Sequence, residues 1–217
     1  MTRPHQLLLI TGTGTEIGKT WVGAALALAL RESGSTVAAR KPAQSFDPGD
    51  TMTDADVLAA ATGEHPHAVC PAHRWYGVAM APFMAAEALE LSPLFLAELV
   101  AEIQWPPDQP VDVGLVEAAG GVRSPMTSDG GDAVDLAGLL APDLVVLVAD
   151  AGLGTINAVR LCLDALESHR VVVFLNRFDE NSDLHRRNLA WLTANTQAAY
   201  ATSVGQLPSL VVSQVRR

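Results

Sequence analysis

A glycine-rich segment near the amino terminus carries the residues best suited to chemistry. It reads Gly12-Thr13-Gly14-Thr15-Glu16-Ile17-Gly18-Lys19-Thr20 and directly follows a short apolar run. A strand that enters such a turn and continues as a helix brings backbone N–H groups and the positive end of the helix dipole around a phosphate chain. Lys19 would then reach the β- and γ-phosphates, and the Thr20 hydroxyl would bind Mg²⁺. The segment therefore predicts nucleotide binding rather than a glycine-rich turn without a ligand.

The spacing of this segment departs from the general phosphate-loop motif. The motif has four residues between its first glycine and the Gly-Lys-Thr. Here five residues lie between Gly12 and Gly18, and Thr13 occupies the usual glycine position. The complete Gly-Lys-Thr still favours a phosphate loop.

Two acidic residues are candidate magnesium ligands. Glu117 ends an apolar run, and Asp54 stands at the start of a predicted helix. Carboxylate and hydroxyl oxygens suit Mg²⁺, so both side chains would act beside Thr20. Taken alone, Asp54 reads better as an acid favoured by the helix dipole, and Glu117 reads equally well as a surface acid. The pair Gly120-Gly121 favours a site at Glu117, because a backbone without Cβ atoms lets a phosphate approach.

Polar residues follow two further predicted strands. Lys41 precedes Pro42, and the chain has only one other lysine, which favours charge neutralisation on a transferred phosphoryl group over an ordinary solvated lysine. Ser45 either donates to a substrate or forms a turn. Asn176 offers a donor and an acceptor that suit the edge of adenine, although asparagine is also a common turn former.

The elements that must position these residues alternate between strands and helices. We expect strands over residues 6–11, 36–40, 111–117, 144–149 and 171–175, and helices over residues 18–33, 53–62, 82–90, 93–104, 132–140, 157–168 and 184–193. Residues 64–78 are expected to be irregular, and Leu207 begins a tail of ambiguous structure. This order predicts an α/β fold with a mostly parallel sheet and helices on both faces, in a single domain over residues 1–217. Ligands in such folds bind at the carboxyl ends of the strands, where the candidate residues fall.

Composition limits the partners and the compartment. The formal charge is −10, from 24 acidic and 14 basic residues, which disfavours binding to nucleic acid or to an anionic membrane. Cys70 and Cys162 are isolated in the sequence, as expected for reduced thiols in a cytoplasmic protein. We expect neither a signal peptide nor a membrane span, because the apolar runs are too short.

Taken together, these motifs resemble the dethiobiotin synthetase family. The resemblance rests on Thr11 to Thr20, Lys41-Pro42, Asp54-Ala55, Ala81-Pro82 with Ala85-Ala86, Val116 to Gly121, Gly152-Leu153-Gly154-Thr155-Ile156-Asn157, Asn176, and Gly205-Gln206-Leu207-Pro208. The motifs occur in the family's order and cover nearly the whole chain. The resemblance implies a P-loop NTPase-like fold, a cytoplasmic homodimer, and closure of the ureido ring of dethiobiotin from 7,8-diaminononanoate, CO₂ and MgATP in biotin biosynthesis.

The resemblance also implies roles for individual residues. Lys19 and Lys41 would be catalytic, and Thr20, Asp54 and Glu117 would bind Mg²⁺. The residues expected to bind the ATP co-substrate are Glu16, Ile17, Gly18, Lys19, Thr20, Trp21, Asp54, Glu117, Ala118, Ala119, Gly120, Asn176, Arg177, Leu207, Pro208 and Ser209. Thr15, Ser45 and Asn157 would bind the diamine substrate.

Four positions depart from the family pattern. Ala118 replaces the usual glycine after the motif glutamate, and Phe83 and Ala158 stand where histidine is common. Arg177 stands where a smaller or acidic residue is common. These departures leave the predicted phosphate and metal ligands unchanged and bear on the identity of the substrate and on nucleotide preference.

Two other functions fit the phosphate loop. One is a further P-loop amidoligase, although that class usually carries a glutaminase domain for which 217 residues leave no room. The other is a nucleotide-switch ATPase of the partition or metal-chaperone type. Such switches tend to have a second lysine early in the loop, where this chain has Gly12, Thr13 and Gly14.

Overall fold

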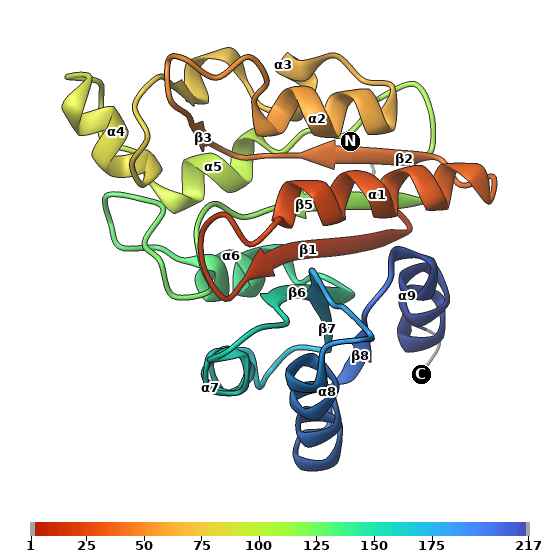
Figure 1. Cartoon of the computed structure of the whole chain (residues 1–217). Coiled ribbons are helices and arrows are strands. Elements are labelled where there is room, and N and C mark those ends of the chain that lie inside the picture. The colour runs from red at the N-terminus through yellow and green to blue at the C-terminus, as the bar shows by residue number, and fades with distance from the viewer. Residues whose placement is uncertain (1–2, 216–217) are drawn as a thin grey trace.

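A six-stranded parallel sheet forms the centre of the molecule (Figure 1). The computed structural model describes residues 3–215. The strands are β1 (Gln6–Gly12), β2 (Val37–Arg40), β5 (Val113–Glu117), β6 (Leu144–Asp150), β7 (Val171–Asn176) and β8 (Ala199–Ala201). Their order in the sheet is β2-β5-β1-β6-β7-β8, and each neighbouring pair is parallel. All the carboxyl ends therefore lie along one edge, as the sequence predicts.

Helices cover both faces of the sheet (Figure 1). One face packs against α1 (Lys19–Glu32), α2 (Asp54–Thr62), α3 (Pro66–Val69) and α9 (Leu207–Val215). The other face packs against α5 (Leu96–Glu102), α6 (Ala133–Leu140), α7 (Thr155–Ala165) and α8 (Asp183–Asn195). Strands covered on both sides are continuously apolar, which explains the sequence of β6.

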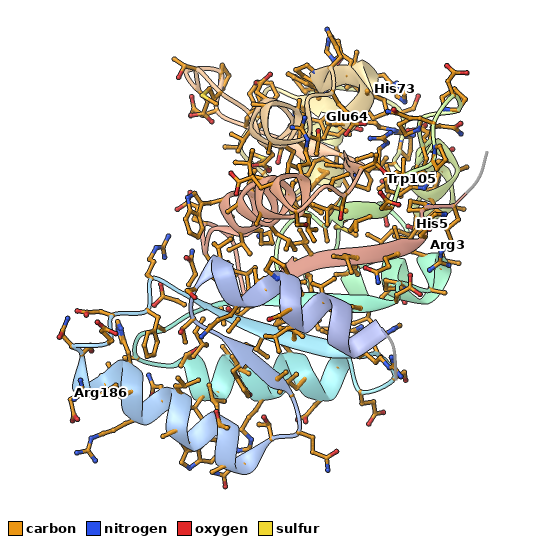
Figure 2. The ribbon with its side chains drawn as sticks, turned by 90° about the vertical axis from the view of Figure 1, so that its right-hand side faces the viewer. Arg3, His5, Glu64, His73, Trp105 and Arg186 are labelled. Atoms are coloured by element: carbon orange, nitrogen blue, oxygen red, sulfur yellow. The ribbon has the colours of Figure 1, made fainter. Side chains whose placement is uncertain are left out.

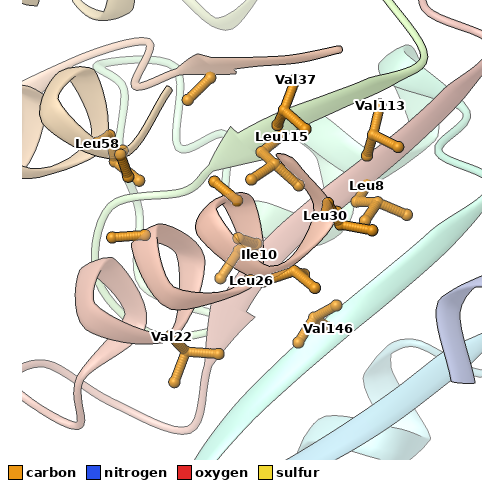
Figure 3. Packing of buried hydrophobic residues seen from close by; sticks show 14 of the residues in the cluster. Leu8, Ile10, Val22, Leu26, Leu30, Val37, Leu58, Val113, Leu115 and Val146 are labelled. Atoms are coloured by element: carbon orange, nitrogen blue, oxygen red, sulfur yellow. The ribbon is translucent and has the colours of Figure 1, made fainter. Parts of the chain in front are cut away.

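The core divides at the sheet because neighbouring residues of a strand point to opposite faces. Leu8 and Ile10 of β1 contact the cluster that includes Val22 and Leu26 of α1 (Figure 3), whereas Leu9 belongs to the cluster on the opposite face. The spacing of Val22, Leu26 and Leu30 predicts one buried helix face, and these three side chains are buried. The core thus fixes α1 over β1, with its amino terminus at the carboxyl end of that strand.

A small subdomain extends from the edge of the sheet at β2. It contains β3 (Gln44–Ser45) and β4 (Trp75–Tyr76), which pair in parallel, together with η1 (Ala72–Arg74) and α4 (Pro82–Ala88). Tyr76, Ala85 and Leu94 form its separate apolar cluster. The expectation that residues 64–78 are irregular is therefore wrong, because α3, η1 and β4 lie within them.

Other element boundaries also differ from the expectations. The helix expected from Pro93 begins at Leu96, because Phe95 has an extended backbone and precedes the first helical residue. The tail from Leu207 is helical, and β8 was not expected at all. The predicted single domain, residues 1–217, extends beyond the described residues and stays a prediction. Among residues 3–215, no helix combines the length and the apolar character needed to cross a bilayer.

Candidate functional site

A cavity of about 770 Å³ opens where β1, β2 and β5 end. It is lined by Thr15, Glu16, Gly18, Lys19, Thr20, Lys41, Gln44, Ser45, Phe46, Asp47, Asp50, Asp54, Ala79, Met80, Ala81, Pro82, Glu117, Ala119, Gly120, Ser124 and Pro125. The sheet supplies its floor, and the small subdomain supplies one wall. Its position at the carboxyl edge of a parallel sheet is the usual position of a ligand site in this class of fold.

The phosphate loop joins β1 to α1 and requires a glycine at its last turn. Gly18 has φ 94°, in the left-handed region that favours glycine, and it precedes the first residue of α1. A Cβ atom at Gly18 would lie 2.2 Å from Asn176 Nδ2. Lys19 Nζ donates to the Gly14 carbonyl oxygen at 2.9 Å, so the lysine side chain folds back along the loop. Burial, reinforced by the positive charge of Lys41, lowers the pKa of Lys19.

Four side chains from different elements meet beside this loop. The Thr20 hydroxyl lies 2.7 Å from Asp54 Oδ1 and 2.9 Å from Glu117 Oε1. Lys41 Nζ donates to Glu117 Oε1 at 2.6 Å and forms an ion pair with Asp54 Oδ2 at 2.8 Å. We call Thr20, Lys41, Asp54 and Glu117 the strand-end cluster. Residues separated by up to 97 positions in the sequence thus share one hydrogen-bond network.

The local structure of α2 fixes Asp54. Thr53 caps the helix by accepting from the Asp56 backbone N–H, and the Asp56 carboxylate accepts from the Thr53 backbone in return. Gln44 Nε2 donates to Thr53 Oγ1 at 3.1 Å, and Gln44 Oε1 accepts from the Ala55 backbone at 2.9 Å. Gln44 therefore fixes the residues on both sides of Asp54.

The strand-end cluster is buried, and its charges depend on one another. Burial alone would lower the pKa of Lys41, but the Glu117 and Asp54 carboxylates outweigh burial and raise it. Burial would raise the pKa of Asp54, but the Lys41 ammonium outweighs it, and Asp54 has a lowered pKa. Burial raises the pKa of Glu117 in spite of the neighbouring Lys41. Lys41 is consequently a fixed positive charge at neutral pH.

The cluster also fits a magnesium ion. Glu117 Oε2 is buried and has no hydrogen-bond partner, which is costly for a carboxylate oxygen unless another group binds there. Thr20, Asp54 and Glu117 provide only oxygen donors, the type that Mg²⁺ binds, and Mg²⁺ usually keeps several waters besides. Among residues 3–215, no group of three or more His, Cys, Asp or Glu side chains is placed to hold a metal. A metal here would therefore need ligands from water or a bound phosphate.

The cavity brings together many of the residues predicted from the sequence. Those that line it are Thr15, Glu16, Gly18, Lys19, Thr20, Lys41, Ser45, Asp54, Glu117, Ala119 and Gly120. Those that do not are Ile17, Trp21, Ala118, Asn157, Asn176, Arg177, Leu207, Pro208 and Ser209. The predicted phosphate and metal ligands therefore gather in one place, and the predicted base ligands lie outside it.

Asn176 and Arg177 contact the outer side of the phosphate loop. Asn176 Nδ2 donates to the Ile17 carbonyl oxygen at 2.7 Å, and its Oδ1 accepts from the Arg177 backbone at 3.0 Å. Arg177 donates to the Glu16 carbonyl oxygen at 2.7 Å and pairs with Asp150 at 2.8 Å. Both residues thus support the loop, and base recognition by Asn176 stays a prediction, for which the amide has its second N–H and the second lone pair of Oδ1.

The other residues outside the cavity have varied environments. Leu207 is fully buried in the core cluster that contains α1, and the Ser209 hydroxyl donates to the Gln206 carbonyl oxygen at 2.9 Å. Trp21 is more than half exposed, and Asn157 is exposed on α7. Their roles in binding ATP or the diamine stay predictions.

Several cavity residues carry no signal that sequence reasoning used. Gln44, Asp47 and Asp50 lie in the segment after β2, and Ser124 and Pro125 follow the Gly120-Gly121 pair. Gln44 is the most informative of them, because a buried glutamine beside a helix start indicates a structural hydrogen bond.

Comparison with known proteins places the chain among nucleotide-dependent enzymes. The family model described as "AAA domain" matches residues 6–213. An ATP-dependent dethiobiotin synthetase BioD from Streptomyces avermitilis is 38% identical over 209 residues, which are 94% of this chain and 84% of that protein. The Streptomyces coelicolor protein of the same name is 40% identical over 75% of this chain and 66% of its own length. The protein of that name from Caulobacter sp. is 40% identical over 81% of this chain and 76% of its own length.

Solved structures with a similar fold are much more distant in sequence. The signal recognition particle receptor FtsY from Elizabethkingia anophelis, in complex with GDP, has a TM-score of 0.57 and 14% identity, over 94% of this chain and 59% of that chain. Chloroplast FtsY from Physcomitrella patens has a TM-score of 0.52 and 16% identity, over 94% and 61%. These similarities confirm the P-loop NTPase-like fold and say nothing about the reaction.

Proposed function

We propose that the cavity at the strand ends is where the ureido ring of dethiobiotin is closed, because the chain belongs to the AAA-domain family and to the family of ATP-dependent dethiobiotin synthetases. It is therefore an ATP-dependent ligase of biotin biosynthesis. The substrates are 7,8-diaminononanoate, CO₂ and ATP, and the products are dethiobiotin, ADP and phosphate. The observation that carries the proposal is the strand-end cluster, in which the phosphate-loop Thr20 contacts two carboxylates that also hold Lys41.

The reaction has three bond-forming steps. One amine of the diamine adds to CO₂ and loses a proton, which gives a carbamate. A carbamate oxygen attacks the γ-phosphorus of ATP, so that ADP leaves and a carbamic–phosphoric anhydride forms. The second amine attacks the carbonyl carbon of this anhydride, expels phosphate and closes the ring. Positioning and charge stabilisation provide most of the rate in such chemistry.

The phosphate loop would hold ATP. Gly18, Lys19 and Thr20, at the amino terminus of α1, line the cavity, where a helix start suits the triphosphate. Lys19 would exchange its contact with the Gly14 carbonyl for the β- and γ-phosphates. Its partial desolvation strengthens that attraction, because charges interact more strongly when water is excluded.

Lys41 would stabilise negative charge on the carbamate and the transferred phosphoryl group. Its ammonium lies inside the cavity and is held by Glu117 and Asp54. Because these carboxylates raise its pKa, Lys41 stays protonated and acts as a charge rather than as a base.

Thr20, Asp54 and Glu117 would hold Mg²⁺. A bound Mg²⁺ neutralises charge on the triphosphate and helps to orient it. The unpartnered Oε2 atom of Glu117 supports this assignment.

The acidic rim of the cavity suits a cationic substrate. Glu16, Asp47 and Asp50 line the cavity together with the two carboxylates of the strand-end cluster. A diamine carries positive charge before it reacts, so these side chains favour its entry. Thr15 and Ser45 line the same space and are the proposed diamine contacts.

The proposed assembly is a cytoplasmic homodimer that binds neither nucleic acid nor membrane. Leu153 is 92% exposed and Leu161 is 61% exposed, and both lie at or on α7, which also carries Asn157. We propose that these exposed leucines take part in association, which would bring Asn157 near a partner. Sedimentation velocity measures the assembly directly, and a monomer at micromolar concentration would contradict it.

One assay separates ring closure from a nucleotide switch. The purified protein is incubated with MgATP, bicarbonate and 7,8-diaminononanoate, and phosphate and dethiobiotin are measured by colour reaction and mass spectrometry. We expect phosphate release only when all three substrates are present, in a one-to-one ratio to dethiobiotin. Slow hydrolysis without the diamine, and no dethiobiotin with it, would support a switch ATPase instead.

A further inference from the structure

The free edge of β2 is closed by Glu64, which follows α2, and by Val69, the last residue of α3. β2 is the first strand of the sheet and pairs only with β5. The Ala39 backbone N–H donates to Glu64 Oε2 at 2.8 Å, and the Lys41 backbone N–H donates to the Val69 carbonyl oxygen at 2.8 Å. These two hydrogen bonds therefore hold the main chain that leads to Lys41 along the edge of β2 that does not pair with β5.

Arg40 links this closure to the segment after α5. Arg40 Nη1 forms an ion pair with Glu64 Oε1 at 2.7 Å, and the guanidinium also donates to the carbonyl oxygens of Gln104 and Ala39. Its carbon centre lies 5.0 Å from the centroid of the Trp105 ring (Figure 2 labels Glu64 and Trp105). One buried residue thus connects Glu64, the end of β2 and Trp105.

A gain in folding stability does not by itself explain the buried ion pair between Arg40 and Glu64. Desolvating two charges costs about as much as their attraction returns, so a buried ion pair is often no better than apolar residues of the same volume. The pair is instead specific in geometry, because the Arg40 guanidinium donates to Glu64 Oε1 while Glu64 Oε2 accepts from the Ala39 N–H, so the carboxylate binds a side chain and the main chain of β2 together. Its position matters, since Lys41 is the next residue in the chain.

We propose that Arg40 and Glu64 are positioning residues for Lys41, which they hold so that its ammonium meets the strand-end cluster. This inference rests on the proposed role of Lys41. Neither Arg40 nor Glu64 lines the cavity, so neither touches the substrates. The phosphate loop follows β1, which β5 separates from β2 in the sheet. A disturbance at Glu64 should therefore reach Lys41 without reaching the ATP phosphates.

The test is the variant Glu64→Gln, which keeps an oxygen for the Ala39 N–H and removes the charge that pairs with Arg40. We expect kcat for dethiobiotin formation to fall about tenfold to a hundredfold, the cost of a small misplacement of a reacting or stabilising group. The Kd for MgATP, measured by calorimetry, should equal that of the wild type. Arg40→Lys keeps the charge and loses the guanidinium hydrogen bonds to the Gln104 and Ala39 carbonyl oxygens, so its kcat should fall between those of the wild type and Glu64→Gln.

Asp143→Asn is the matched control. Asp143 Oδ2 also accepts from a strand N–H, that of Leu7 at 2.7 Å, and also pairs with an arginine, Arg3 at 3.3 Å, but at the amino end of β1. This variant should lose stability and keep its kcat. Wild-type kcat in Glu64→Gln, or an equal loss of kcat in Asp143→Asn, would overturn the inference.

A readout independent of turnover separates this inference from the proposed function. The NMR signal of the Lys41 ammonium should shift in Glu64→Gln and Arg40→Lys and stay unchanged in Asp143→Asn. A wild-type protein that makes no dethiobiotin would contradict the proposed function, whereas an unshifted Lys41 signal would contradict the positioning role alone.

Discussion

The Lys41 ammonium lies 2.6 Å from Glu117 Oε1, across the ends of two neighbouring strands. β2 and β5 pair in parallel up to Arg40 opposite Val116, and Lys41 and Glu117 are the next residues along the two segments. The contact is thus a consequence of strand pairing rather than of loop conformation. It places the fixed positive charge of Lys41 beside a carboxylate that has one oxygen free.

Removing the Lys41 ammonium should abolish ring closure and spare nucleotide binding. In Lys41→Gln we expect kcat to fall about 100-fold or more, the loss typical of a group that stabilises developing charge. The Kd for MgATP should change little, because Lys19 and the loop N–H groups are unaltered. Unchanged turnover in this variant would contradict the catalytic role of Lys41.

Removing the Glu117 charge should weaken the dependence on magnesium. In Glu117→Gln the Mg²⁺ concentration that gives half-maximal ATP binding should rise, because a charged oxygen ligand becomes a neutral one. The measurement is a Mg²⁺ titration at fixed ATP. Asp47→Asn is the control, since Asp47 lines the same cavity without contacting Thr20; equal Mg²⁺ titrations for both variants would argue against a metal ligand at Glu117.

A methyl group at Gly18 should disable the phosphate loop. Gly18→Ala would force a left-handed backbone on alanine and would set its Cβ against the Asn176 amide. We expect a loss of stability of about 1–2 kcal/mol from the backbone strain and a larger loss of MgATP affinity. Gly138→Ala has open space and an ordinary helical backbone, so it should keep the affinity and raise the unfolding temperature slightly, because alanine favours the helix more than glycine does.

As the pH is raised, the affinity for MgATP should fall at a lower pH than the one at which an ordinary lysine loses its proton. Burial and Lys41 lower the pKa of Lys19 below 10.5, and only its protonated form attracts phosphate. As the pH rises through this lowered pKa, Lys19 of the free enzyme loses its proton. MgATP binding then requires Lys19 to be protonated again, which lowers the apparent affinity. Lys41 does not cause this loss of affinity, because Glu117 and Asp54 raise its pKa.

Calorimetry in buffers of different ionisation enthalpy tests this pH dependence. At alkaline pH the binding of MgATP should take up a proton, which makes the measured heat depend on the buffer. Lys19→Arg keeps a charge that does not titrate in this range, so its binding should show no proton uptake. Proton uptake that persists in Lys19→Arg would assign the titration to another group.

Most of the sheet could be predicted from the sequence because its strands are buried on both faces. The apolar run of β6 and the strand before Asn176 have no other stable environment, and the phosphate loop fixes the direction of β1. β8 escaped prediction because Ala199–Ala201 is short and lies at the far edge of the sheet, where it pairs only with β7. Pro93 suggested a helix start, but the backbone there stays extended until Phe95.

The site residues that could be predicted are likewise those next to elements with a clear sequence pattern. Thr20, Lys41 and Glu117 each follow or end an element with a clear pattern, so their convergence at the sheet edge follows from parallel pairing. Gln44 and the acidic rim depend on how the small subdomain folds over the cavity, which no periodicity in the sequence indicates. The base ligands stay predictions, because Asn176 and Leu207 have protein contacts that sequence reasoning had no means to foresee.

The place of β5 between β1 and β2 has a further consequence for how the enzyme could change during evolution. Neighbouring strands are held about 4.8 Å apart by their hydrogen bonds, so the backbone alone sets the spacing between β1, which leads to the phosphate loop of Lys19, and β2, which leads to Lys41. Substitutions can alter the length or charge of the side chains near the ends of β1 and β2, but they cannot bring these two strands closer together. New specificity must therefore arise in the walls contributed by the small subdomain, while the spacing of the two strands that lead to Lys19 and Lys41 stays constant.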